Sequence, residues 1–156
     1  MLAGGLLGAF LSVCAVLLHI SSSHQDVPAS PAATTSMEKP IRDGQIEFLV
    51  RSSQPIVVSP GPPPDLVQVV KVRLTNTGTS PQSVSVDDQV MIDDRGHEYP
   101  TDPLVSAQLN TTQAMELQSG DTAEISLPFD VPGEARPAVV LLHAGSLTPG
   151  VAVTLK

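Results

Sequence analysis

The chain has 156 residues, and its sixteen acidic side chains outnumber eight basic ones, giving a formal net charge of −8. Because Lys and Arg hold nucleic-acid phosphates and anionic lipid headgroups, this balance argues against a nucleic-acid partner and against attachment to an anionic bilayer surface. The single cysteine excludes an intramolecular disulfide.

The chain opens on an apolar run from Leu2 to Ile20 that contains no charged side chain. As a helix rising about 1.5 Å per residue, this run comes close to the ~30 Å hydrocarbon core of a membrane. It predicts a retained single-pass anchor over residues 1–20, with the rest of the protein outside the cytoplasm. Cleavage before His24, after the small residues Ser21 and Ser23, is the alternative and would give a secreted protein.

Cys14 lies within this apolar run, and two interpretations of it stay open. In the first it is a small buried hydrophobe, as free cysteines commonly are. In the second it carries a lipid, as the first residue of a bacterial lipoprotein does, which would change only how the protein is held at the membrane.

The composition changes sharply after the apolar run. Residues 21–40 are dominated by Ser, Ala, Thr and Pro, with little to bury, and predict a disordered linker. Residues 41–156 are close to the commonest domain length and predict one folded domain.

Apolar and polar residues alternate along most of this domain, which is the pattern of half-buried strands. At least seven short strands are predicted, around residues 46–50, 70–74, 84–86, 90–92, 125–129, 139–142 and 151–155. Asp87 and Asp88 interrupt the alternation and predict a bulge or a change of sheet. For residues 106–116 we expect either a short helix or a loop.

Turn residues separate these strands, as in Asn76–Gly78, Asp93–Gly96 and Pro149–Gly150. We expect Asn76 to bond to its own backbone and Gly78 to take the left-handed region, while Gly96 provides a hairpin bulge. Tyr99 is expected to pack at the edge of the core with its hydroxyl paired. Many short strands with such turns predict an all-β, immunoglobulin-like antiparallel β-sandwich of about seven strands.

Three motifs follow one another in a definite order: a strand and turn over residues 70–78, an acidic hairpin over 93–99, and a Gly turn at 117–121 that leads into 127–132. In this order they resemble a family of extracytoplasmic bacterial domains of unknown function. That family has a telokin-like immunoglobulin sandwich, similar to that of the mycobacterial secreted immunoprotective antigen. The resemblance implies a fold and a location but no catalytic residues.

Acidic residues gather in one stretch of the domain: Asp87, Asp88, Asp93, Asp94, Glu98 and Asp102. Carboxylate oxygens are the ligands that Ca²⁺ prefers, although the spacing does not match an EF-hand loop. Because strand ends and turns collect carboxylates anyway, we expect a solvated acidic edge and keep a calcium site as the alternative.

No other residue set predicts a metal or cofactor site. His97 and His143 lie on different predicted strands, and Met91 and Met115 do not complete a compact His and Met set for copper. We therefore predict no cofactor and no metal ligand.

The sequence also carries no catalytic signature, and we predict that the protein is not an enzyme. A Gly-x-Ser-x-Gly turn before a helix is missing from the sequence, and Ser146 beside His143 is interpreted as a turn between the last strands.

Two classes of function then stay open. The first is a binding or adaptor domain, tethered to the bacterial membrane, that contacts another extracytoplasmic or membrane protein; the second is a structural accessory of a membrane complex. With no Trp and one Tyr, the sequence shows no obvious aromatic binding surface. Residues 60–64 are interpreted as a rigid Pro-rich connection, with an exposed recognition motif as the alternative. Asn110-Thr111-Thr112 fits a glycosylation acceptor that only a eukaryotic secretory host would use reliably.

Overall fold

The computed structural model describes residues 30–59 and 65–156. The predicted anchor at residues 1–20 with Cys14, the linker up to residue 29 and the Pro-rich connection at residues 60–64 lie outside the described residues. Within the described ranges, no helix has the length and apolar character needed to cross a membrane.

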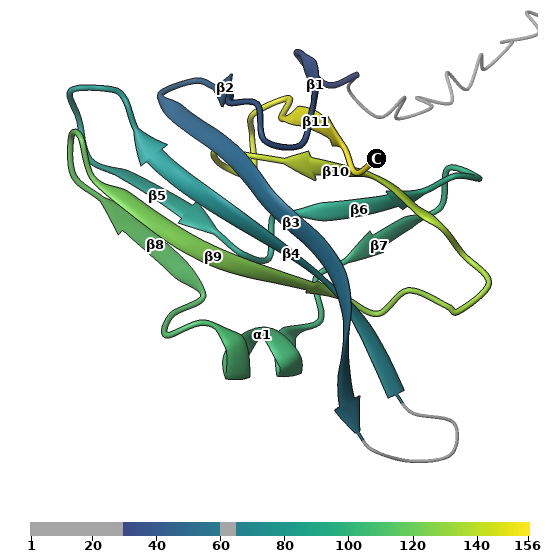
Figure 1. Ribbon diagram of the computed structural model, residues 1–156. Coiled ribbons are helices and arrows are strands. Elements are labelled where there is room, and N and C mark those ends of the chain that lie inside the picture. Colours follow the sequence, from purple (N-terminus) through teal and green to yellow (C-terminus); the bar gives the residue numbers. More distant parts are fainter. Residues whose placement is uncertain (1–29, 60–64) are drawn as a thin grey trace, which may run out of the picture.

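The described chain forms strands with one short helix between them (Figure 1). In chain order the elements are β1 (Thr34–Ser36), β2 (Ile41–Asp43), β3 (Ile46–Ser59), β4 (Asp65–Asn76), β5 (Gln82–Ser85), β6 (Val90–Asp93), β7 (Glu98–Pro100), α1 (Pro103–Leu109), β8 (Ala114–Leu117), β9 (Thr122–Phe129), β10 (Pro137–Leu142) and β11 (Val151–Thr154). Every predicted strand overlaps one of these. The change of sheet predicted at Asp87 and Asp88 is confirmed, because β5 and β6 belong to different sheets.

The strands form a β-sandwich, as predicted. One layer is a five-stranded sheet in the order β1-β11-β10-β6-β7, and the other is a four-stranded sheet in the order β2-β3-β4-β9. β5 and β8 form a separate pair. The inward positions of the two layers meet in one apolar core that contains Phe48, Leu74, Met91, Phe129 and Val140, all fully buried.

The folded domain begins earlier than the sequence predicts. β1 lies within the stretch assigned to the linker and pairs in parallel with β11. The pairing is continued by the N–H of Ala32, which donates to the Gly150 carbonyl over 2.9 Å, and by that of Met37, which donates to Thr154 over 3.2 Å. The backbone of this polar segment is held by hydrogen bonds rather than by apolar burial, which is why composition did not reveal it.

The β3–β4 hairpin is much longer than the other strand pairs and projects beyond the sandwich (Figure 1). Its distal part has a small core of its own, in which Val67 and Val69 pack with Val105 of α1. α1 begins where Asp102 caps it, because the Asp102 Oδ1 accepts from the N–H groups of Leu104 at 2.8 Å and Val105 at 3.0 Å. The helix therefore begins and ends earlier than the predicted stretch at residues 106–116.

In the turn after β4, the predicted contact of Asn76 is present, but the predicted backbone conformation of Gly78 is not. The Asn76 Oδ1 accepts from the N–H of Gly78 at 2.9 Å, which confirms the Asn turn. Gly78, however, does not have a positive φ. Glycine is needed there because a Cβ would lie 1.8 Å from the Gln45 Oε1. Gly96 does have a positive φ, of 85°, in the β6–β7 turn.

Candidate functional site

Asp93 does not belong to a solvated acidic edge, which corrects the expectation for this residue. It is only 4% exposed. Its Oδ1 accepts from the N–H groups of Arg95 and His97, both at 2.8 Å. Its Oδ2 accepts from the Tyr99 hydroxyl at 3.1 Å and lies 3.0 Å from the His97 Nδ1. The pairing of the Tyr99 hydroxyl is thereby confirmed.

These contacts determine the charge states of Asp93 and Tyr99. Burial alone would raise the pKa of Asp93, but the hydrogen bonds from His97, Arg95 and Tyr99 outweigh it and hold the pKa well below its usual range. Burial and the adjacent Asp93 carboxylate raise the pKa of Tyr99. Asp93 is thus an ionised organiser of the β6–β7 turn.

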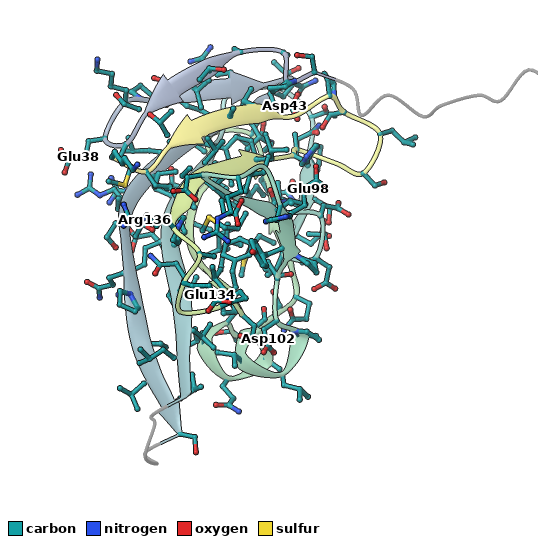
Figure 2. The ribbon with its side chains drawn as sticks, turned by 90° about the vertical axis from the view of Figure 1, so that its right-hand side faces the viewer. Glu38, Asp43, Glu98, Asp102, Glu134 and Arg136 are labelled. Atoms are coloured by element: carbon teal, nitrogen blue, oxygen red, sulfur yellow. The ribbon has the colours of Figure 1, made fainter. Side chains whose placement is uncertain are left out.

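The other acidic residues of the stretch do not converge on Asp93. Asp94 and Glu98 are exposed, and the carboxylate of Asp102 is occupied in capping α1. Figure 2 shows Glu98 and Asp102 at different levels of the domain. In the described parts of the chain, no three His, Cys, Asp or Glu side chains lie close enough together to hold a metal ion.

The histidines and methionines considered for copper are placed in separate environments. His97 faces Asp93, Met91 is buried in the core and Met115 is half-buried at its rim. His143 lies in the β10–β11 connection with its Nδ1 3.2 Å from the Thr148 carbonyl oxygen. Ser146 in the same connection is exposed, and no hydrogen bond between its side chain and His143 is found among the described residues.

Sequence reasoning missed two buried polar residues that fix this connection. The Asp43 Oδ2 accepts from the Ala144 N–H at 2.8 Å and from the Thr148 hydroxyl, and Figure 2 shows Asp43 beside the yellow C-terminal segment. The Gln89 side chain accepts from the His143 N–H at 2.8 Å and donates to its carbonyl at 3.0 Å. Asp43 ends β2 and Gln89 directly precedes β6, both far from the connection in the sequence, so spacing along the chain carried no signal of the contact.

The glycosylation acceptor considered at Asn110 is engaged within the protein. Its Nδ2 donates to the carbonyl oxygens of Ser126 at 2.8 Å and Ser106 at 3.2 Å. A glycan attached to this nitrogen would have to displace these contacts.

An apolar depression lies where the β3–β4 hairpin leaves the sandwich. This hairpin groove has a volume of about 220 Å³ and is lined by Pro55, Leu66, Gln68, Val131, Pro132, Gly133, Ala135 and Pro137. Beside it, Val57 is 59% exposed and Leu66 is 44% exposed, and the two are paired across the strands. The sequence pattern does not indicate this surface, because the alternation in β3 ends at Val50, where the register with β4 shifts.

A second apolar depression, of about 330 Å³, crosses the outer face of the five-stranded sheet. It is lined by Ser30, Pro31, Thr34, Ile92, Glu98, Val139, Leu141 and Ala152. A sheet face open to water is ordinarily polar, so this face is more apolar than its position requires.

Comparison with known proteins gives the fold and its relatives. The sequence matches the family described as Domain of unknown function (DUF4352) over residues 35–149. No curated protein matches the sequence. Among solved structures, the chain is similar to the yjhA protein from Bacillus subtilis, with a TM-score of 0.56 and 12% identity over 78% of this chain and 99% of that one. It is also similar to MPT63, a secreted protein from Mycobacterium tuberculosis, with a TM-score of 0.52 and 17% identity over 81% of this chain and 98% of that one.

Proposed function

This chain belongs to the family Domain of unknown function (DUF4352). A fold alone does not imply an activity, so we propose a function from the surface of the domain. We propose that the protein is a non-enzymatic binding or adaptor domain outside the cytoplasm. The hairpin groove is the proposed contact surface. Its occupant is an uncharged aliphatic segment of a partner protein, because none of the described residues that line the groove is charged.

The exposed Val57–Leu66 pair is the observation that carries this proposal. In β4, Leu66 shares with Val70 and Val72 the face that points into the sandwich core. The hairpin thus extends the inner face of its sheet past the opposing layer, and its last two apolar side chains on this face stay about half exposed. Covering what remains exposed would contribute roughly 1 kcal/mol for each side chain. Such a contiguous apolar patch marks an interaction surface more often than two scattered residues do.

Two observations support a location outside the cytoplasm. The uncharged run from Leu2 to Ile20 suits an anchor or an export signal, and one relative in fold is described as secreted. We propose a retained anchor, with secretion after cleavage as the alternative. Carbonate washing of membranes distinguishes them: an anchored chain stays in the pellet, whereas a soluble chain that starts near His24 shows cleavage.

Photocrosslinking in the native cells tests the binding function. A photoreactive amino acid at position 57 should give one discrete adduct with another protein. The same amino acid at position 147 is the control, because Leu147 is 97% exposed but lies away from the groove. The double variant Val57→Lys, Leu66→Lys should abolish co-purification of the crosslinked protein while the melting temperature stays within about 2 °C.

The second class of function, a structural accessory, makes a different prediction. A spacer needs its fold and its tether but not this patch. Two results together would refute the binding proposal in favour of the spacer. The photoreactive amino acid at position 57 would give no adduct, and cells that carry the folded double variant would have the wild-type phenotype.

A further inference from the structure

The two strands that follow α1 leave a gap between them. β8 leads into β9 through a tight turn, in which the Asp121 N–H donates to the Gln118 carbonyl at 3.0 Å. Beyond the turn the two strands do not pair with each other: β9 belongs to the four-stranded sheet, and within the described residues β8 pairs only with β5. A groove of about 300 Å³ lies between them, lined by Lys71, Leu109, Asn110, Thr111, Thr112, Met115, Glu124, Ile125 and Ser126.

The free edge of β9 is only partly covered. Ser126 is bonded as if to another strand, because its N–H donates to the Asn110 Oδ1 at 2.9 Å and its carbonyl accepts from the Asn110 Nδ2 at 2.8 Å. The Pro128 carbonyl accepts from the N–H of Asp102 at 2.8 Å. Alternate residues of an antiparallel strand turn their backbone groups to the same edge, so Glu124 and Thr122 share the edge of Ser126. Among the described residues, no hydrogen-bond partner is found for their backbone groups on this edge.

The edge of β8 presents the complementary groups. The Val86 N–H donates to the Gln113 carbonyl, which places the backbone groups of Met115 toward β5. Those of Ala114 and Glu116 therefore turn away from β5. The Ala114 carbonyl accepts from the Thr112 hydroxyl, and the Glu116 groups have no partner in the described chain.

From this geometry we propose that the gap between β8 and β9 is a binding site for an extended peptide segment of another protein, which enters as an added strand. In the part of the gap away from the turn, one edge of the peptide would bond to the backbone groups of Glu124, and the other to the N–H of Ala114. The added strand would join the four-stranded sheet to the β5–β8 pair. Main-chain bonding of this kind gives affinity, and the side chains that alternate along the peptide give specificity.

The walls of the groove define the peptide chemistry. Met115 and Ile125 lie on the core side, where aliphatic peptide side chains would be buried. On the outer side Glu116 is exposed, Glu124 is paired with Arg73 at 3.0 Å, and the whole chain carries a charge of −8. The peptide that fits therefore alternates aliphatic residues with hydroxyl or basic ones. This site is separate from the hairpin groove, and its occupancy does not depend on the function proposed there.

Nuclear magnetic resonance of the full chain, ¹⁵N-labelled and kept in a mild detergent, tests the proposal. The probe is the blocked peptide Lys-Val-Thr-Val-Lys. At millimolar peptide, the amide signals of Ala114, Glu116, Thr122 and Glu124 should shift. A copy of the peptide N-methylated on alternate residues should bind at least tenfold more weakly, because it loses donors along one edge.

A substitution in the edge provides the matched control. Glu124→Pro removes the outward N–H but no bond to β4, and Pro128 already occupies an equivalent position in β9. We expect it to weaken binding at least tenfold, whereas Glu124→Thr, which keeps the N–H, should change binding less than threefold. Absence of shifts at these amides, or shifts unaffected by N-methylation, would overturn the proposal. Shifts that appear without peptide as protein concentration rises would assign the edge to a second copy of the chain instead.

Discussion

At the scale of single residues, the Asp93 carboxylate links the β6–β7 turn to pH. It accepts from Arg95, His97 and Tyr99 in its ionised form, and these bonds lower its pKa. An unfolded Asp titrates near pH 3.9. Between that value and the lower folded pKa, the unfolded chain binds more protons than the folded one. The stability from Asp93 is therefore present above this window and is lost as the pH falls through it.

Urea unfolding at a series of pH values checks this linkage. We expect the free energy of unfolding of the wild type to fall as the pH drops below about 4. Asp93→Asn should be less stable at pH 7 and should show a flatter decline in acid. Asp94→Asn, which changes an exposed neighbour, is the control and should follow the wild type. Parallel acid profiles for wild type and Asp93→Asn would contradict the assignment.

Tyr99 offers a direct spectroscopic reading of the same contact, because it is the only tyrosine of the chain. Burial, the hydrogen bond to Asp93 and its negative charge raise the Tyr99 pKa above the usual value near 10. Its contribution to stability is present below pH 10 and is lost as the pH rises above it. Tyrosinate absorbance should thus appear at higher pH in the folded protein than in urea, and Asp93→Asn should reduce the difference. Equal titration in both states would disprove the contact.

At the scale of elements, alternation identified the strands whose two faces meet different surroundings. In β4, Val72 is 1% exposed in the core, whereas Arg73 forms a surface ion pair with Glu124 at 3.0 Å. The strands β1, β2 and β7 escaped prediction because none of these three-residue segments has a polar residue between two apolar ones, and β8 overlaps the stretch at residues 106–116 that was predicted as a helix or a loop. The sequence also did not predict that the Asp93 side chain points inward while that of Asp94 is exposed, since both are acidic turn residues. The gap between β8 and β9 depends on tertiary packing that spacing does not encode.

The face assignment in β4 predicts unequal effects of the same new side chain. Val72→Asp would bury an unpaired charge and should cost about 3–5 kcal/mol of unfolding free energy. Arg73→Asp loses an exposed ion pair and should cost about 1 kcal/mol or less. Denaturant unfolding measures both, and equal costs would show that the two faces have been exchanged.

The turn after β4 predicts a steric effect. Gly78→Ala would bring a Cβ against the Gln45 side chain and should cost roughly 1–3 kcal/mol. The control is Gly133→Ala, where an added Cβ meets nothing within 4 Å. Similar stabilities of the two variants would mean that Gln45 moves aside freely.

At the scale of the whole molecule, the boundary of the domain follows from β1 rather than from composition. Thr34, Thr35 and Ser36 pair with Ala152, Val153 and Thr154, so the stretch before residue 41 closes one edge of the five-stranded sheet. The family match begins at residue 35, in the same strand. A segment that looks like a linker by composition is thus part of the fold.

This boundary predicts that the start of a fragment determines its stability. A fragment of residues 41–156 keeps the main core and should still unfold cooperatively, with a β-rich circular dichroism spectrum. It loses the β1–β11 ladder, including the Ala152 N–H bond to the Ala33 carbonyl at 2.9 Å, and leaves the β11 edge open. We expect it to be less stable than the fragment 30–156 by roughly 2 kcal/mol, or about 5–10 °C in melting temperature. The open edge should also make the shorter fragment more prone to association at high concentration, because unpaired strand edges recruit other strands. Equal melting temperatures for the two fragments would show that β1 contributes nothing to the fold and would return the domain boundary to residue 41.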